Sequence, residues 1–218
     1  MRPEIHLITD RKQSRLPLAR AIEAALKGGI DRVQLREKTA APALALYELA
    51  LKTIPLAGRE RVIVNDRVDV ALAVEAGGVH LAGRSLPPLA VRPLIGDRLL
   101  GVSVHGLDEA RVAAESGADY VTFGHVYPTA SKPGLPPRGL RELERIVEAV
   151  DVPVLAVGGI DPSNAPEVLA TGASGVAVIS SVLASPDPES AARALRRATE
   201  DHRPRVPFVT RKKGERCT

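Results

Sequence analysis

The chain has 218 residues, enough for one sizeable domain or two very small ones, and its 44% hydrophobic and 26% charged residues are typical of a globular protein. Five aromatic residues and one cysteine, Cys217, exclude an aromatic core, an internal disulfide framework and a cysteine-based zinc site. Six of the 30 basic residues and only one acidic residue fall within 203–218, so the net charge of +4 belongs to this end of the chain.

These properties also limit the partners of the protein. Few aromatic side chains could stack on bases, so we expect no nucleic-acid partner. No apolar run reaches the roughly 18 residues that a membrane span needs, and the first residues lack a signal-peptide pattern. We therefore expect a soluble, cytoplasmic protein without membrane contact.

Short apolar runs alternate with longer amphipathic segments along the chain. In chain order, the apolar runs predict strands at 6–9, 32–35, 61–65, 78–81, 100–104, 120–123, 152–157 and 175–179. The segments between and after them predict helices that include 18–27, 43–51, 107–116, 140–150 and 188–199. This alternation is shared by a (β/α)₈ TIM barrel and a doubly wound sheet.

Polar or glycine residues follow nearly every predicted strand, which favours the α/β TIM barrel because its strand ends converge on one rim, where active sites are built. We expect a single domain, with the barrel over residues 1–202. Residues 203–218, rich in Arg, Lys and Pro, are expected to form a basic, flexible C-terminal tail.

A candidate phosphate site follows the last two strands. Gly158 and Gly159 can bring backbone N–H groups close to a ligand before a helix that we expect to open at Asp161 or Ser163, and Ser180 and Ser181 add further donors. The alternative is two tight turns with no ligand.

Cationic and hydroxyl side chains suggest a substrate pocket at the same rim. Arg36 and Lys38 can face one pocket with Gln34 and suit a phosphate or carboxylate, although a solvated Arg-Glu-Lys turn would look the same. Ser103, Thr129 and Lys132 are further candidate substrate contacts.

The stretch 123–134 is too long and too rich in Pro, Gly and hydroxyl residues for a simple connection, and such loops are commonly functional. His125 comes directly after the predicted sixth strand. Its unperturbed pKa lies near neutrality, so it is the candidate for proton transfer, against the alternative of a loop histidine satisfied by backbone. His80, inside a strand, is expected to be a satisfied core histidine.

Evidence for a metal is thin. Asp66 ends the third strand and could help hold Mg²⁺, but Ser85 stands where a second carboxylate would be useful, and Asp66 could equally cap the following helix. We expect no metal and no cofactor, with Asp66 as a Mg²⁺ ligand only if the protein is a synthase.

Several ordered segments resemble the thiamine phosphate synthase superfamily over residues 4–200. The resemblance rests on 33–38 (VQLREK), 64–69 (VNDRVD), 78–81 (GVHL), 101–105 (GVSVH), 118–121 (ADYV) and 156–160 (AVGGI). It implies a (β/α)₈ barrel that binds a thiazole phosphate, and it makes a homodimer plausible.

The superfamily has two similar branches. Synthases couple a pyrimidine diphosphate to the thiazole phosphate, using Mg²⁺ held by Asp residues after strands three and four, and usually carry Gly-Pro after strand six. Here the second Asp position is Ser85 and the dipeptide is Gly124-His125, which resembles the thiazole tautomerase (TenI-like) branch.

The tautomerase resemblance implies that His125 is the acid/base that isomerises a carboxythiazole phosphate to its aromatic form. Arg36 and Lys38 would hold its carboxylate, and Gly158, Gly159, Ser180 and Ser181 its phosphate. Lys132 matches a diphosphate-contacting lysine of synthases, which keeps a Mg²⁺-dependent synthase as the alternative. A non-catalytic thiazole phosphate sensor is the third possibility.

Overall fold

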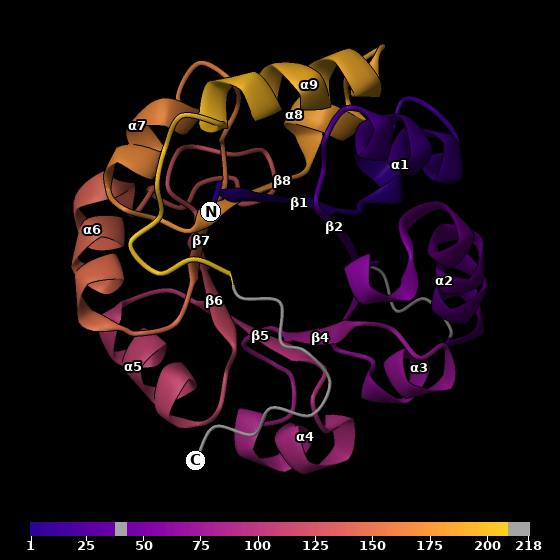
Figure 1. Cartoon of the computed structure of the whole chain (residues 1–218), viewed down its shortest axis with the longest axis horizontal. Helices are drawn as coiled ribbons and strands as arrows, with labels where there is room; N and C mark the ends of the chain where they lie inside the picture. Colours follow the sequence, from indigo (N-terminus) through magenta and orange to yellow (C-terminus); the bar gives the residue numbers. More distant parts are fainter. Residues whose placement is uncertain (38–42, 209–218) are drawn as a thin grey trace.

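Eight parallel strands pair in chain order, and β8 pairs with β1, so the sheet closes into a barrel (Figure 1). The computed structural model describes residues 1–37 and 43–208. The strands are β1 Glu4–Ile8, β2 Arg32–Leu35, β3 Val62–Asn65, β4 Gly78–Leu81, β5 Leu99–Val104, β6 Tyr120–Gly124, β7 Val154–Val157 and β8 Gly175–Val178. The predicted single-domain TIM barrel is confirmed, and the doubly wound sheet is excluded.

Helices surround the barrel (Figure 1). They are α1 Leu18–Lys27, α2 Ala43–Ala57, α3 Val68–Ala73, α4 Pro88–Ile95, α5 Leu107–Glu115, α6 Gly139–Ala149, α7 Ala165–Ala170, α8 Ser180–Leu183 and α9 Pro188–Thr199, with short 3₁₀ turns η1 Arg11–Gln13 and η2 Arg59–Arg61. Helix α2 continues past its predicted end at residue 51. Buried Thr53 fits this extension because its hydroxyl donates to the Leu49 carbonyl (2.8 Å).

The two faces of the strands have different chemistry. Side chains such as Val33, Val64 and Val121 are fully buried in the main hydrophobic cluster, as a parallel sheet covered by helices requires. The barrel interior, by contrast, contains polar side chains. His80 and Tyr120 lie there, both buried, and the His80 Nδ1 is 3.1 Å from the Tyr120 hydroxyl. Burial is the main cause that lowers the pKa of His80 to about 3, so this imidazole is neutral at pH 7.

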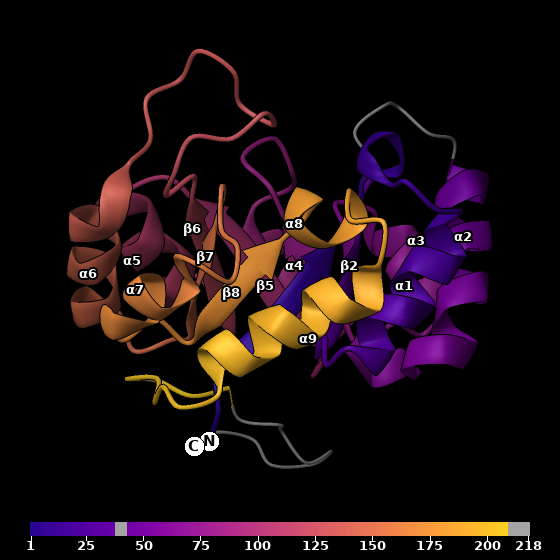
Figure 2. The ribbon, with the colours of Figure 1, turned by 90° about the horizontal axis from the view of Figure 1, so that it is seen from above.

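The two ends of the barrel differ. The loops after the strands, including the long one between β6 and α6, rise from one end, while the N-terminus and residues 200–208 after α9 lie at the other (Figure 2). Arg205 donates to the carbonyls of Val147 (3.0 Å) and Val150 (2.9 Å), and the Phe208 ring centroid lies 5.5 Å from those of His6 and Tyr120. Residues 203–208 of the expected tail therefore contact the barrel, and 209–218 lie outside the described residues.

A buried arginine joins the last helix to the first strand. Arg196 of α9 donates to the carbonyls of Pro3 (2.8 Å) and Gly29 (2.9 Å) and pairs with Asp31, whose other contacts include the backbone N–H of Ile5 (2.8 Å). This network ties α9 to the point where the barrel closes. Within the described ranges no helix is both long and apolar enough to cross a membrane.

Replacing Arg196 with alanine should destabilise the fold by about 3 kcal/mol, because the carbonyls of Pro3 and Gly29 and part of the Asp31 carboxylate lose their donor. Urea unfolding measures this loss. The exposed neighbour Arg197 is the control, and its alanine variant should stay within about 0.5 kcal/mol of wild type. Equal losses in both variants would contradict the assigned network.

The free energy of unfolding should fall at acid pH because His80 becomes protonated on unfolding. Its folded-state pKa lies below the unfolded value, so its contribution is complete above about pH 6.5 and is lost as pH falls toward 3. Between pH 6.5 and 4.5 the free energy of unfolding should fall by roughly 2 kcal/mol, and less in His80→Gln. Glu4 acts at lower pH: burial opposes its ionisation, but contacts with His6 and Arg32 lower its pKa to about 2. If the free energy of unfolding of His80→Gln depends on pH as steeply as that of the wild type, His80 is not the source of this pH dependence.

Candidate active site

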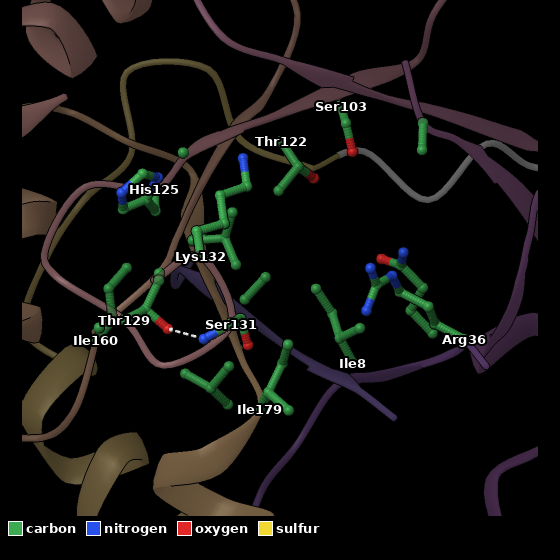
Figure 3. Close-up of a pocket in the computed structure, with 18 of the residues that line it drawn as sticks. Ile8, Arg36, Ser103, Thr122, His125, Thr129, Ser131, Lys132, Ile160 and Ile179 are labelled. Atoms are coloured by element: carbon green, nitrogen blue, oxygen red, sulfur yellow. Dashed lines mark hydrogen bonds between the residues drawn. The ribbon is translucent and has the colours of Figure 1, made fainter. Parts of the chain in front are cut away.

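A cavity of about 520 Å³ opens among the carboxyl ends of the strands (Figure 3). Every predicted site residue that the structure describes lines it, except Asp66, which was expected only for a synthase. The lining includes Gln34, Arg36, Ser103, His125, Thr129, Lys132, Gly158, Gly159, Ser180 and Ser181. Lys38 lies outside the described residues. The roles assigned to these side chains stay predictions.

Backbone hydrogen bonds hold the chain at His125 and at the two residues after it. The next two residues, Val126 and Tyr127, donate to the carbonyls of Val157 (2.9 Å) and Gly158 (3.0 Å), which pins this segment to the loop after β7. The His125 carbonyl accepts from Arg138 (2.9 Å), so the long loop leaves and returns at the same place.

The imidazole of His125 is buried, and its two nitrogens differ. Nε2 lies 3.2 Å from the Leu135 carbonyl, whereas Nδ1 has no hydrogen-bond partner among the described residues. Because a carbonyl can only accept, this contact places the proton of the neutral ring on Nε2. Nδ1 is then the basic nitrogen.

At both positions of the candidate phosphate site, the backbone conformation favours glycine and the neighbouring atoms leave no room for a side chain. Gly158 and Gly159 have φ values of +101° and +68°, in the region that favours glycine. A Cβ at Gly158 would overlap the Cβ of His125, and one at Gly159 would lie 2.7 Å from the Cβ of Tyr127. The turn therefore brings its backbone close to the His125 loop.

The segment after these glycines forms a turn and not the start of a helix. Asp161 Oδ1 accepts from the Ser163 N–H (2.7 Å) and hydroxyl (2.6 Å), while Asn164 donates to the Gly159 carbonyl (2.9 Å). Helix α7 begins only at Ala165, so the expected start at Asp161 or Ser163 is wrong: these side chains bind the turn instead. Nearby, the buried hydroxyl of Ser181 has no partner within the described structure.

Two cations enter the cavity from opposite sides (Figure 3). The Arg36 backbone is fixed by Thr9, whose hydroxyl accepts from the Arg36 N–H (2.8 Å). Lys132 lies on the long loop, where Gln13 contacts Ser131 (3.4 Å). Burial, followed by the charges of Arg138 and Arg36, lowers the pKa of Lys132. The cavity thus has a positive field suited to an anionic ligand.

Asp66 is engaged by its neighbours. It accepts from the Asn65 amide (2.6 Å) and the Ser85 hydroxyl, and it does not line the cavity. Its side chain does not cap α3, whose N-cap is Arg67, so the capping alternative is wrong. The described residues contain no group of three His, Cys, Asp or Glu side chains that could hold a metal. With Ser85 in place of a second carboxylate, these residues do not fit a Mg²⁺ site of the kind that a synthase would need.

The sequence did not single out several polar residues that line the cavity floor. Asn65 accepts from Gln34 (2.7 Å), and the Thr122 hydroxyl is buried without a partner among the described residues. His80 is satisfied at both nitrogens, as expected, but it also lines the cavity, where Nε2 lies 2.8 Å from the Ser103 hydroxyl. Alternation along β3, β4 and β6 could have indicated these inward positions.

Comparison with known proteins shows which family the chain resembles. The sequence model described as thiamine monophosphate synthase matches residues 5–182. A putative thiamine-phosphate synthase of Geobacter sulfurreducens is 48% identical over 88% of this chain and 92% of its own length. A thiamine-phosphate synthase of Roseiflexus castenholzii is also 48% identical, over 88% of this chain and 86% of its own length.

A solved structure agrees with these sequences. The thiamine phosphate pyrophosphorylase of Pyrococcus furiosus superposes with a TM-score of 0.81 and 38% identity, covering 89% of this chain and 94% of that protein. These names favour the synthase alternative over the tautomerase branch. With the family match over most of the barrel and several relatives above 40% identity, the chain belongs to the thiamine monophosphate synthase family.

Proposed function

We propose that this member of a thiamine-biosynthesis family is a thiazole tautomerase, which isomerises a carboxythiazole phosphate to its aromatic form without a metal. The observation that carries the proposal is His125 itself: it lines the same cavity as the adjacent glycine turn and the two cations, and one of its ring nitrogens has no described partner. Proton transfer is the chemistry that such a residue can supply.

The reaction needs one proton to move. His125 Nδ1 takes the proton from the ring carbon, and the electrons of that C–H bond enter the ring as it becomes aromatic. The electron pair of the exocyclic double bond forms a new C–H bond at the outer carbon with the proton that Nδ1 returns, so that both remaining double bonds lie within the ring. The Nε2–H, held by the Leu135 carbonyl, keeps the same tautomer ready for the next turnover.

The remaining pocket residues bind and orient the substrate in this proposal. Arg36, with Lys38 predicted beside it, attracts the carboxylate and stabilises negative charge that develops as the proton leaves. The backbone of Gly158 and Gly159, with Ser180 and Ser181, holds the phosphate away from the reacting carbons. The homodimer that the family resemblance implies stays a prediction.

A thiamine phosphate synthase is the second candidate, and the names of the relatives favour it. In that reading Lys132 would contact a diphosphate and Asp66 would hold Mg²⁺. The contacts of Asp66 weigh against it, since this carboxylate is engaged by Asn65 and Ser85 and belongs to no group of three candidate metal ligands in the part of the chain that the structure describes.

A transferase assay separates these two candidates. Purified protein given the pyrimidine diphosphate, the thiazole phosphate and Mg²⁺ should release no diphosphate above the protein-free control, because the metal ligands are incomplete. Enzyme-coupled detection of diphosphate measures this release. Steady release would establish the synthase and end the tautomerase proposal; binding without any turnover would favour the sensor.

His125→Ala should reduce tautomerisation by about 10²–10⁴-fold, the usual effect of removing a general acid/base, and leave affinity for the aromatic product nearly intact. Arg36→Ala should instead weaken both binding and turnover, because its charge acts on substrate and transition state alike. Kinetics and calorimetric titration measure the two effects.

The matched control for this pair is His202→Ala, since His202 follows α9 and does not line the cavity. It should keep wild-type kinetics. Wild-type tautomerisation by His125→Ala would place the proton carrier elsewhere and remove the main support for this branch of the family.

A further inference from the structure

Three inward-facing side chains form a hydrogen-bonded column from the barrel core to the cavity floor. Tyr120 on β6 contacts His80 Nδ1 on β4 (3.1 Å), and His80 Nε2 contacts the Ser103 hydroxyl on β5 (2.8 Å). Tyr120 is buried beneath the cavity, His80 is buried but reaches the cavity floor, and Ser103 lines the cavity. We refer to Tyr120, His80 and Ser103 as the column.

The chain makes room for this column with a glycine. A Cβ at Gly101, which lies between β4 and β6 in the sheet, would overlap the Tyr120 hydroxyl and the His80 Nδ1. The φ of Gly101 is not positive, so the backbone conformation does not require glycine here. The missing side chain instead permits the Tyr120–His80 hydrogen bond.

The direction of the hydrogen bonds follows from the chemistry of the groups. Burial raises the pKa of Tyr120, so the phenol keeps its proton, and His80 Nδ1 is its one hydrogen-bond partner among the described residues. A buried O–H is costly unless it donates, so Tyr120 donates to Nδ1. The neutral imidazole then has its hydrogen on Nε2, which donates to Ser103 Oγ.

We propose that Tyr120 and His80 are positioning residues that fix Ser103 as a hydrogen-bond donor toward the bound substrate. Because Ser103 Oγ already accepts from His80, its own hydrogen remains for the cavity. Thr122, the partner of Ser103 across the strands, does not take it, since the Thr122 hydroxyl has no described partner.

The consequence is specificity for an acceptor at this point of the pocket. A ring nitrogen of a heterocycle or a carboxylate oxygen can receive the Ser103 hydrogen, whereas a donor group there would be left unpaired. With the opposite histidine tautomer, Ser103 would donate to His80 and present only lone pairs. This inference rests on the proposed function only in placing the substrate ring in this cavity.

The tautomer of His80 can be measured in the unmodified full-length protein. In ¹⁵N-histidine-labelled protein, the nitrogen NMR signals of His80, assigned by their loss in His80→Gln, should show a protonated Nε2 and an unprotonated Nδ1 at pH 7. A protonated Nδ1 would overturn the proposal, whether or not the protein is a tautomerase.

Variants test whether the column acts through Ser103. Ser103→Ala should weaken binding of the aromatic carboxythiazole ethyl phosphate about tenfold, the effect of one lost hydrogen bond, and Tyr120→Phe about threefold. Tyr120→Phe should also give a mixture of His80 tautomers. Tyr47→Phe, on α2 outside the cavity, is the matched control and should change neither.

The double variant distinguishes positioning from a general structural effect. Tyr120→Phe combined with Ser103→Ala should bind no more weakly than Ser103→Ala alone, because the phenol acts only through that hydroxyl. The proposal is refuted if the affinity loss of the double variant equals the product of the two single losses, or if the His80 nitrogen signals do not change in Tyr120→Phe. If the wild type binds no thiazole phosphate at all, the proposed function fails, while the tautomer measurement still decides the state of the column.

Discussion

Two backbone hydrogen bonds, from Val126 to Val157 and from Tyr127 to Gly158, fix the relation between the two halves of the site. They hold the loop of His125 against the glycine turn after β7. The contact is close enough that a side chain at Gly158 would overlap His125. Backbone contacts thereby hold His125, the proposed proton carrier, in a fixed position relative to the glycine turn proposed to bind phosphate.

The interior of the barrel supports this site from below. Ile63, Tyr120 and Leu155 fill the barrel interior with Phe208 packed against them, while His80, Asn65 and Thr122 face the cavity above. A buried polar layer is stable only when its groups are paired, and most here are. Three of the groups without a described partner, the Thr122 and Ser181 hydroxyls and His125 Nδ1, belong to residues that line the cavity, whereas a fourth, His6 Nδ1, lies deeper in the barrel.

Sequence patterns predicted the barrel and most of the rim because both depend on local order: apolar runs make strands, and residues that follow them reach the rim. Contacts between distant segments were not predictable in this way. The Tyr120–His80 hydrogen bond spans 40 residues, and the Ser85 contact that occupies Asp66 spans 19. The start of α7 was misplaced because Asp161 and Ser163, which resemble helix caps, bind their own turn. Likewise, only the fold shows that Arg205 and Phe208 pack under the barrel.

The central claim is that this pocket moves a proton without a metal. Proton NMR of the non-aromatic carboxythiazole phosphate, mixed with the full-length protein in excess EDTA, tests it most directly. The account predicts that the aromatic product forms well above the buffer rate and at the same rate when Mg²⁺ replaces EDTA. No acceleration over buffer in either condition, or acceleration only with Mg²⁺, would contradict it.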